Sequence, residues 1–491
     1  MSHPNPQHHA TGLMDARAKI PPGIPSANPT ISYWQDPPAD IADLRSPPEL
    51  PPTAEYVVVG SGISGSSIAY NLLCKRPGSS VCLLEARQAC SGATGRNGGH
   101  TKAASYRAFL DHERELGIEE AVKIARLEYA NIIATHAFAK ENKIDCASTI
   151  CNTVDIVYSQ AQLELGCKAI ARMREVMHED HPAAQYTIWS AEEARRRFRT
   201  PHALGAFEYL AGSLSAYDFT IGLLKLSLAK GLNVQTNTPA HSITSRDVDG
   251  KAEWTVQTPR GSITTANLVL ATNGYTAHLL PQTQGVIVPL RGQVVAQRPG
   301  RGLPQNGLEH TYSFIHETGY EYMISRPPSS RNEGDVVIGG GIWTLPNDGA
   351  SQSGETDDSM LEPTITAFLR QCTLGYFGDA WGRDHPEGRI KKEWSGIMGA
   401  SPDGLPYVGP VPGLPGLWIS ASFNGHGMVW CLKAAEAVVE LLAGTREARE
   451  AMQRWFPASA IITEARLKRK FSGRKDLGAP GEGAFGERSR L

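Results

Sequence analysis

The sequence predicts an α/β fold, with one domain built on a dinucleotide-binding parallel sheet and a second domain built on an antiparallel sheet. Three observations carry this prediction. An apolar strand ends in a turn with Gly60, Gly62 and Gly65 in the spacing G-x-G-x-x-G. A second apolar strand ends in an acidic residue, Glu85. Alternating segments between residues 286 and 343 are typical of antiparallel strands.

The glycine-rich turn has the composition of a pyrophosphate-binding site. Residues 56–59 are apolar and β-prone, and residues 66–73 follow as a helix whose positive end faces the phosphates. The glycines allow a tight turn, a close approach of the backbone to the pyrophosphate, and close packing of helix on strand. Glu85 stands where a carboxylate accepts ribose hydroxyls. We therefore predict dinucleotide binding rather than a plain glycine-rich turn.

Length and composition indicate an ordinary globular protein. A chain of 491 residues exceeds one compact core, so two interleaved domains are expected. The net charge of −2 gives no electrostatic reason to expect nucleic acid as a partner. No apolar run approaches the roughly 18 residues of a membrane span. The first residues lack a secretory signal, and the eight cysteines are scattered, so we expect an intracellular protein without metal or disulfides.

The expected organisation has seven segments. A proline-rich arm, mostly extended, covers residues 1–53 and docks through Tyr33 and Trp34. The nucleotide domain is expected to come from three separate segments, residues 54–110, 205–283 and 393–446. Residues 111–204 form a helical part of the substrate domain, and residues 284–392 form its sheet. Residues 447–491 are a C-terminal helix and a flexible tail.

Periodicity predicts the individual elements. Helices are expected at residues 118–142 and 160–178, after Ser190 in a capping box with Glu193, at 218–230 with Asp218 as its cap, at 358–373 and at 427–442. The first two helices are expected to lie far from any strand ladder. Strands are expected at residues 232–236, 268–271, 286–298, 311–325, 335–343 and 417–420, with a meander at 240–248, 252–258 and 262–266. The last strand and helix repeat the opening pattern, so they are expected to return to the first sheet.

Further glycine-rich segments follow other predicted strands, at residues 91–99, 268–274, 403–409 and 423–428. Together with the first turn they resemble the D-amino-acid oxidase superfamily of FAD-dependent amine and amino-acid oxidoreductases, over residues 54–445. Within that family the chain looks most like the γ-glutamylputrescine oxidase branch and its fungal relatives. The resemblance implies a Rossmann-like FAD-binding domain of the GR2 type, with FAD bound non-covalently because Gly396 occupies the position of a tethering cysteine.

The resemblance also implies the residues that bind FAD. They are Gly60, Ser61, Gly62, Ile63, Ser64, Gly65, Glu85, Ala86, Arg87, Ser91, Gly92, Ala93, Thr94, Arg96, Asn97, Gly98, Ala240, Thr272, Asn273, Gly274, Asp403, Gly404, Gly425, His426, Gly427 and Met428. Backbone N–H groups of residues 91–99 can converge on anionic oxygens, with Arg96 reaching a phosphate or the flavin edge, unless this segment is only a mobile loop. Residues 425–428 are expected to begin a helix whose N–H groups face the flavin, where His426 either adds charge or serves as a structural cap.

Departures from the family pattern concern the substrate. Met398 stands where relatives carry the arginine that binds an α-carboxylate, so a free α-amino acid held in that way is not expected. Tyr322, His100 and Lys102 are the candidates for catalytic residues, although Tyr322 can equally pack in the core. Lys102 or Arg326 can anchor an acidic group, with a solvated surface charge as the alternative. An apolar residue near Val337 replaces the lysine that relatives use for oxygen activation.

The expected reaction is the oxidation of a C–N bond in an amine or an amino-acid-derived substrate. Hydride transfer to flavin N5 would give an imine, and molecular oxygen would then yield hydrogen peroxide. Alternatives are a dehydrogenase or tailoring enzyme that uses another electron acceptor, and a non-catalytic FAD-binding protein. A NADPH-dependent monooxygenase is disfavoured because no second G-x-G-x-x-G is present.

Two short basic signals concern the location of the protein. Ser489, Arg490 and Leu491 form a variant of the S-K-L address, which predicts a peroxisomal import receptor as partner and a peroxisomal rather than cytoplasmic location. The basic run at residues 466–470 competes as a nuclear-type signal, or it is a solvated helix end.

Overall fold

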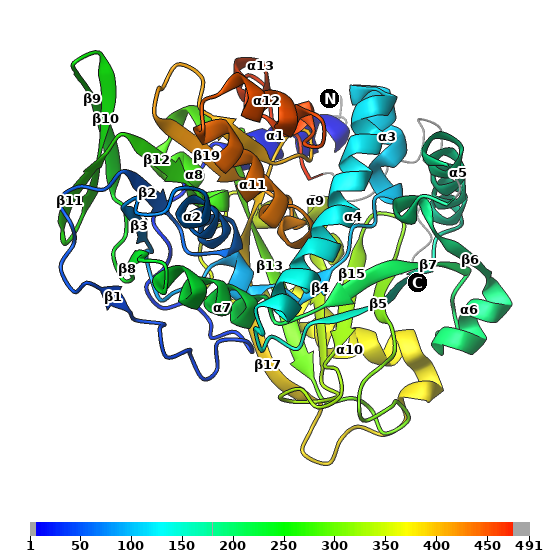
Figure 1. Ribbon diagram of the computed structural model, residues 1–491. Coiled ribbons are helices and arrows are strands. Elements are labelled where there is room, and N and C mark those ends of the chain that lie inside the picture. Colours follow the sequence, from blue (N-terminus) through cyan, green and yellow to red (C-terminus); the bar gives the residue numbers. More distant parts are fainter. Residues whose placement is uncertain (1–5, 179, 475–491) are drawn as a thin grey trace, which may run out of the picture.

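The computed structural model describes residues 6–178 and 180–474, which form two large sheets, a small three-stranded sheet and their covering helices (Figure 1). The first sheet has seven strands in the order β1-β8-β3-β2-β12-β19-β18. They are β1 (Arg45–Ser46), β8 (Asn233–Gln235), β3 (Val81–Leu84), β2 (Tyr56–Val59), β12 (Asn267–Leu270), β19 (Leu417–Ala421) and β18 (Tyr407–Pro410). The five central strands are parallel, and β1 and β18 pair antiparallel at the two edges. This confirms the predicted α/β fold and the return of the last strand to the first sheet.

The first sheet is covered on both faces, which explains its continuous apolar strands. Every residue of β2 and β3 is buried. Helices α2 (Ile63–Lys75), α7 (Ala216–Leu228) and α11 (Cys431–Leu442) pack together on one face (Figure 1). The predicted meander covers the other face as β9 (Ser242–Val248), β10 (Lys251–Thr258) and β11 (Gly261–Thr265).

The second sheet has nine strands and is antiparallel except for one pair, β5 with β14. In order they are β17 (Ile390–Ala400), β13 (Val288–Gln297), β16 (Val336–Gly340), β15 (Tyr320–Ser325), β14 (Thr311–Ile315), β5 (Thr149–Val157), β7 (Gly205–Ser213) and β4 (His100–Thr101), with β6 (Thr187–Ser190) also pairing with β7. Sequence periodicity missed β5 and β7. The expectation that the neighbouring helices lie far from strands is therefore wrong. The domain boundaries themselves stay a prediction.

Most predicted helices are present with small shifts at their ends. The remaining ones are α3 (Tyr106–Leu116), α4 (Ile118–Glu141), α5 (Gln160–Met177), α6 (Ala191–Phe198), α8 (Thr276–Leu279), α9 (Pro346–Gly349), α10 (Pro363–Phe377), α12 (Arg446–Gln453) and α13 (Glu464–Leu467). Ser190 caps α6 by accepting the Glu193 N–H at 3.3 Å, as predicted. The predicted cap of α7 is wrong, because Ser215 is the N-cap and accepts the Asp218 N–H at 3.2 Å. Helix α10 begins later than expected, at Pro363, whose fixed φ suits a first helical position.

The N-terminal arm is not wholly extended, because residues Pro6–Ala18 form α1. Its docking through Tyr33 and Trp34 is confirmed, since these rings are only 8% and 5% exposed. Tyr33 Oη donates to Asp335 at 2.7 Å, and the Tyr33 ring stacks on Trp394 of β17. Residues 6–53 of the arm therefore contact both large sheets, through β1 at one and through Tyr33 at the other.

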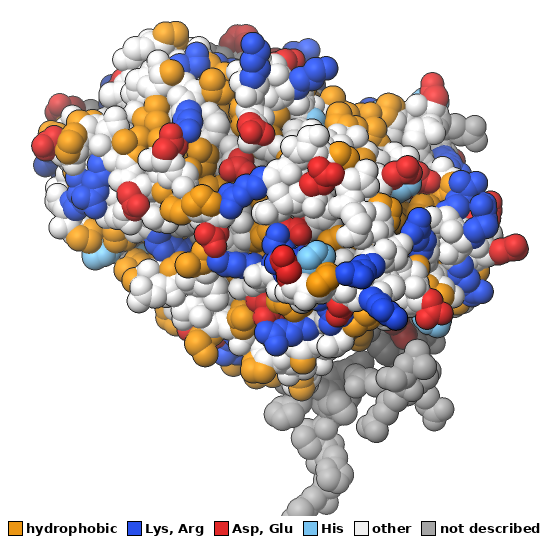
Figure 2. Space-filling model, turned by 90° about the horizontal axis from the view of Figure 1, so that it is seen from below, with side chains coloured by type: hydrophobic (Ala, Val, Ile, Leu, Met, Phe, Trp, Pro, Cys, Tyr) orange, Lys and Arg blue, Asp and Glu red, His pale blue; other side chains and the backbone are white. Residues whose placement is uncertain are grey.

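The surface offers no strong charge asymmetry on the face in Figure 2, where acidic and basic side chains are interspersed. None of the helices in residues 6–178 and 180–474 is both long and apolar enough to cross a bilayer. Ser489, Arg490 and Leu491 lie outside the described residues, so the peroxisomal location stays a prediction. Arg466 is 6% exposed, so the interpretation of the basic run as a solvated helix end is wrong at that position.

Candidate active site

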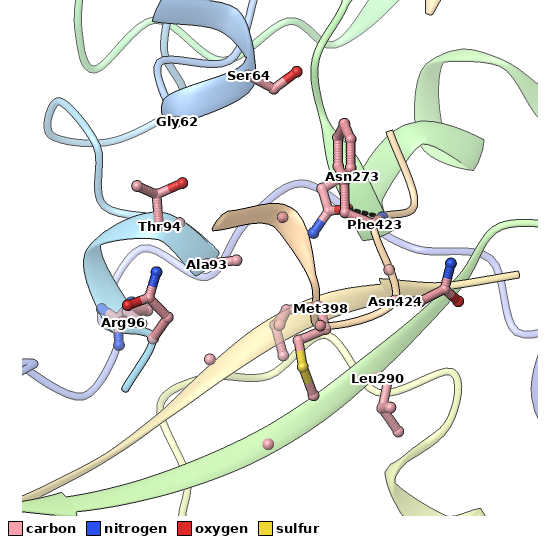
Figure 3. A pocket seen from close by; sticks show the side chains of 18 of the residues that line it. Gly62, Ser64, Ala93, Thr94, Arg96, Asn273, Leu290, Met398, Phe423 and Asn424 are labelled. Carbon is pink, nitrogen blue, oxygen red and sulfur yellow. Dashed lines mark hydrogen bonds between the residues drawn. The ribbon is translucent and has the colours of Figure 1, made fainter. Parts of the chain in front are cut away.

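A cavity of about 320 Å³ extends between the two sheets. At one end it meets Gly60 and Ala271, which follow the carboxyl ends of β2 and β12. At the other end it meets Leu290, Tyr322 and Met398 on the antiparallel sheet; Figure 3 shows Leu290 and Met398 on adjacent strands there. Ligands of open α/β sheets bind outside the carboxyl ends of the strands, so the first end has the position of a nucleotide site.

The glycine corner owes its shape to close backbone packing. Gly60 has φ +109°, and a Cβ there would lie 2.5 Å from the carbonyl oxygen of Ala271 on the next strand. A Cβ at Gly65 would collide with the Gly60 carbonyl oxygen. Helix α2 begins at Ile63, three residues earlier than predicted, so its first turn directly borders the cavity. The corner therefore presents helix N–H groups to an anion.

Glu85 is oriented at the cavity wall by three protein donors. Its Oε2 accepts from the backbone N–H and the hydroxyl of Ser61, at 3.0 and 2.6 Å. Its Oε1 accepts the Arg87 N–H at 3.0 Å. A carboxylate has about four acceptor positions, so Glu85 keeps room to accept a hydroxyl from a ligand.

The segment 91–99 is an ordered wall of the cavity, not a loose loop. Thr94 Oγ1 accepts the Ile63 N–H at 3.1 Å, which ties this wall to the start of α2. The Arg96 guanidinium is used within the protein, because it donates to the carbonyl oxygens of Ser91 at 2.8 Å and Ser395 at 2.9 Å. Burial lowers the pKa of Arg96 to about 10, against the opposing charge of Asp358. These hydrogen bonds make Arg96 a support of the wall; it also lines the cavity, so its contact with a phosphate or the flavin edge stays a prediction.

Asn273 joins the ends of β12 and β19. Its Oδ1 accepts the backbone N–H groups of Ser422 at 3.0 Å and Phe423 at 3.3 Å, the second of which is drawn in Figure 3. A Cβ at Gly274 would collide with the carbonyl oxygen of Met398. This corner therefore brings the two sheets into direct backbone contact beside the cavity.

The C-terminal pair of predicted segments has two different roles. Gly425, His426, Gly427 and Met428 line the cavity. The expected helix does not start there, because residues Gly427–Val429 form a 3₁₀ turn and α11 begins at Cys431. His426 is the N-cap residue of that turn, with its Nδ1 3.0 Å from the Asn424 carbonyl oxygen. The helix-dipole argument at this position is therefore wrong.

Asp403 and Gly404 do not line the cavity. Asp403 instead accepts two hydrogen bonds of 2.9 Å from the buried guanidinium of Arg466. The pair joins the C-terminal segment to the first sheet. Four more predicted FAD-binding residues do not line the cavity: Ser61, Gly65, Ser91 and Gly274. All the other predicted FAD-binding residues line it.

Lys102 belongs to a buried ion cluster at the substrate end of the cavity. Its Nζ contacts Asp155 and the Ser313 hydroxyl, and its side chain is 6% exposed, so a solvated surface charge is excluded. Asp155 also binds Arg107 at 2.7 Å and accepts the Tyr106 and Tyr209 hydroxyls at 2.8 and 3.0 Å. Burial would raise the pKa of Asp155, but the charges of Arg107 and Lys102 lower it below its ordinary value. The cluster therefore holds the Asp155 anion, the Arg107 cation and, when Lys102 is protonated, a second cation.

The second candidate, His100, has both ring nitrogens buried with no hydrogen-bond partner among the described residues. Burial, together with the charge of Lys102, lowers the pKa of His100 well below its ordinary value. The imidazole is therefore neutral at pH 7, with one donor and one acceptor nitrogen. Buried polar atoms need partners, so His100 stands where a ligand can bind.

Tyr322, the third candidate, lines the same end, with its ring centroid 6.3 Å from that of His100. A Cβ at Gly98 or at Gly339 would collide with the tyrosine ring, so both glycines make room for it. Burial raises the pKa of Tyr322, which keeps the phenol protonated. Tyr322, His100 and Lys102 are thus brought together, whereas Arg326 packs over Trp34 at 5.2 Å and does not line the cavity.

Several site residues escaped the sequence analysis. Asp155 and Arg107 come from β5 and α3, and no motif surrounds either of them. Gly23, Ile24 and Pro25 of the arm and Arg474 near the C-terminus also line the cavity. Their signal in the sequence is weak because each lies far along the chain from the residues it contacts. Within residues 6–178 and 180–474 no group of three or more His, Cys, Asp or Glu side chains could hold a metal ion.

Comparison with known proteins gives one family. The family described as FAD dependent oxidoreductase (DAO) matches residues 55–441. "Probable oxidoreductase OrdL" of Rhizobium meliloti is 24% identical over 398 residues, covering 80% of this chain and 83% of that protein. The gamma-glutamylputrescine oxidoreductase of Escherichia coli is 21% identical over 409 residues, covering 80% and 85%. The crystal structure of glycine oxidase from Geobacillus kaustophilus has a TM-score of 0.65 at 18% identity, covering 84% of this chain and 99% of that one.

Proposed function

Because the chain belongs to the DAO family of FAD dependent oxidoreductases, we propose that it oxidises the C–N bond of an amine that carries an acidic group. FAD is the cofactor, and the family membership makes the chain an oxidoreductase. Relatives of similar sequence include a gamma-glutamylputrescine oxidoreductase and glycine oxidases, whose names refer to amine and amino-acid substrates.

The residues of the cavity fit FAD. Gly60 and Gly62 keep the turn tight and free of side chains, because a Cβ at Gly60 would meet the backbone of Ala271 and one at Gly62 would meet Thr94. A pyrophosphate can therefore approach the backbone of this turn. Glu85 is positioned to accept ribose hydroxyls, and residues 425–428 together with Asn97 and Gly98 would hold the flavin half. When bound there, FAD supplies the acceptor for the hydride that would leave the α-carbon, while the amine nitrogen would lose a proton and the C–N bond would become an imine.

The substrate class is argued from the charge of the cavity wall. Glu85 is the only acidic side chain that lines the cavity among the described residues, whereas Arg87, Arg96, Lys102, Arg107 and Arg474 all line it. Arg87 and Arg96 already pair with Asp358 behind the wall, so the substrate class is inferred from Lys102 and Arg107. At the substrate end, Asp155 balances only one of its two cations. A buried excess of positive charge is costly without a counter-charge, so this wall favours a carboxylate on the substrate. This one observation carries the proposal.

Each substrate-side residue then has a defined task. Lys102, directly after β4, and Arg107 of α3 bind the acidic group, a task that relatives give to an arginine at the position of Met398 on β17. Neutral His100 accepts an N–H of the amine at one ring nitrogen. Tyr322 keeps its phenolic proton and closes the wall beside the amine. The residues thus bind and orient the substrate and exclude water, and no strong base is required.

The test compares matched substrates in the absence of oxygen. We expect an amine with a carboxylate to bleach the flavin absorption at lower concentration than its neutral carboxamide. In Lys102→Met this preference should fall roughly tenfold or more, because a charge-assisted hydrogen bond is lost. Lys433→Met is the matched control, since Lys433 pairs with Glu436 and does not line the cavity. Equal bleaching by acid and amide in the wild type contradicts the acidic substrate, and no bleaching by any amine favours a non-catalytic FAD-binding protein.

The electron acceptor is proposed to be molecular oxygen, which would take up the two electrons as hydrogen peroxide. Protein reduced by substrate without oxygen is mixed rapidly with oxygenated buffer, and the return of the flavin absorption is followed. Fast recovery with one equivalent of peroxide supports an oxidase. Recovery too slow for turnover favours the dehydrogenase alternative with another acceptor.

A further inference from the structure

The N-terminal arm lies outside the part of the chain that the family covers, which begins at residue 55. It nevertheless reaches the cofactor cavity, because Gly23, Ile24 and Pro25 form part of the cavity wall. Ile24 is 42% exposed, although it is a large apolar side chain. An exposed isoleucine in the wall of a ligand cavity indicates a surface that the ligand covers.

The arm also holds the wall segment 91–99 in place through three side chains. The Ser32 hydroxyl donates to the Gly95 carbonyl oxygen at 2.6 Å, and Trp34 Nε1 donates to the Asn97 carbonyl oxygen at 2.6 Å. Thr30 Oγ1 accepts from Arg96 at 3.2 Å. Three consecutive residues of the segment 91–99, Gly95, Arg96 and Asn97, are thus hydrogen-bonded to the arm.

A third contact places the arm beside Glu85. The Ser26 carbonyl oxygen accepts from the Arg87 guanidinium at 3.1 Å. The backbone N–H of the same arginine donates to Glu85, the predicted ribose acceptor. The Asp358 carboxylate accepts a hydrogen bond of 3.0 Å from Arg87. The backbone carbonyl oxygen of Asp358 accepts a hydrogen bond of 2.9 Å from the Thr30 hydroxyl. The arm therefore borders the nucleoside end of the cavity.

We propose that the arm completes the FAD site: Ile24 and Pro25 cover the adenosine half, while Thr30, Ser32 and Trp34 hold the loop that binds the rest. An adenosine placed against Glu85 buries the exposed face of Ile24, which stabilises the complex by the hydrophobic effect. Because the arm covers the cofactor, FAD leaves only after the arm moves. The arm thus slows release of a non-covalently bound cofactor.

The test measures retention of FAD rather than oxidation of a substrate. Holoprotein is diluted into buffer without FAD, and the fluorescence of released FAD is followed with time. We expect Ile24→Ala to release FAD roughly tenfold faster than the wild type, because apolar contact with the ligand is lost. Ile31→Ala is the matched control, since Ile31 is 59% exposed on the same arm and does not line the cavity.

A second pair of variants addresses the loop. Ser32→Ala and Trp34→Phe each remove one hydrogen-bond donor while keeping the shape of the arm, so both should speed release and shift the visible flavin absorption band. Ile24→Ala should leave that band in place, because it acts on the other half of the cofactor. If Ile24→Ala releases FAD no faster than Ile31→Ala does, the proposal that Ile24 covers the adenosine half of FAD is wrong. Unchanged release and spectra in the Ser32 and Trp34 variants would overturn the role of the arm in holding the loop. Neither result depends on which amine is oxidised.

Discussion

At the scale of single residues, Lys102 is the group that most affects what the cavity attracts. Burial lowers the pKa of Lys102 most strongly, Asp155 opposes this and Arg107 adds to it, and together they bring the pKa of Lys102 to about 7. A carboxylate in the cavity interacts favourably only with the protonated form. The charge state of one buried amine therefore controls anion binding near neutral pH.

The first prediction concerns the pH dependence of anion binding to the holoprotein. An unreactive carboxylate such as acetate, whose binding is followed through the change it causes in the flavin spectrum, should bind with constant affinity between about pH 6 and about pH 7, where it is fully ionised. Above that pH the affinity should fall by about tenfold per pH unit, because Lys102 must regain a proton before the anion binds. The facing groups do not titrate in this range: the pKa values of His100 and Asp155 are lowered, and those of Arg107, Tyr106, Tyr209 and Tyr322 are raised.

Two variants separate Lys102 from other titrating groups. Lys102→Met should bind the carboxylate weakly at every pH, and Lys102→Arg should bind it with no decline, because an arginine stays charged in proteins. A wild-type affinity that stays constant between about pH 6 and about pH 9 contradicts the prediction.

At the scale of elements, the turn between β2 and α2 depends on backbone contacts that leave no room for a side chain. Gly65 is the sharpest case, because it is helical and needs no unusual φ, and yet a Cβ there would strike the Gly60 carbonyl oxygen. Its role is therefore steric rather than conformational.

The second prediction follows from this contact. Gly65→Ala should destabilise the protein by roughly 1–3 kcal/mol or more, because α2 must move away from β2. The displaced helix should also retain less FAD, measured as the flavin-to-protein ratio after gel filtration. Gly375→Ala in α10 is the matched control, since a Cβ there has nothing within 4 Å. The steric argument is wrong if Gly65→Ala keeps full FAD and the thermal unfolding midpoint of the wild type.

At the scale of the whole molecule, one buried ion pair ties the C-terminal segment to the nucleotide-binding sheet. The Asp403 and Arg466 side chains are 4% and 8% exposed, and the arginine also donates to the carbonyl oxygens of Leu405 and Pro406. Burial would raise the pKa of Asp403, but Arg466 lowers it below its ordinary value. Removing one partner leaves a buried charge without compensation.

The third prediction is that Arg466→Met lowers the free energy of unfolding by about 3–5 kcal/mol. The rate of FAD release from folded protein should not change, because Asp403 does not line the cavity. Arg469→Met should cost far less, since Arg469 is 45% exposed and lies 3.3 Å from the same carboxylate. Denaturant unfolding measures the first quantity and FAD fluorescence the second. If folded Arg466→Met releases FAD faster than the wild type, Asp403 contributes to FAD binding and the prediction is wrong.

The sequence predicted correctly the elements whose structure depends on residues close together in the chain. The β2 strand, its glycine turn and the following helix are consecutive, so their spacing alone implies the phosphate corner. The helices at residues 118–142 and 160–178 carry their own periodicity, and α4 and α5 match them closely. Strand β5 was missed because its inward half, Val154 to Val157, is buried on both faces and shows no alternation.

The strand, the glycine turn and Glu85 are enough to imply a dinucleotide-binding α/β fold, because local hydrogen bonding and turn sterics encode that motif. That the dinucleotide is FAD follows from the family resemblance of the further glycine-rich segments. Three contacts follow only from the packed fold: Asp155 binds Lys102, Arg466 binds Asp403, and the arm lines the cavity at Ile24. These contacts join residues far apart in the chain. Their formation depends on how two sheets and an arm pack in three dimensions, which no short pattern of residues records.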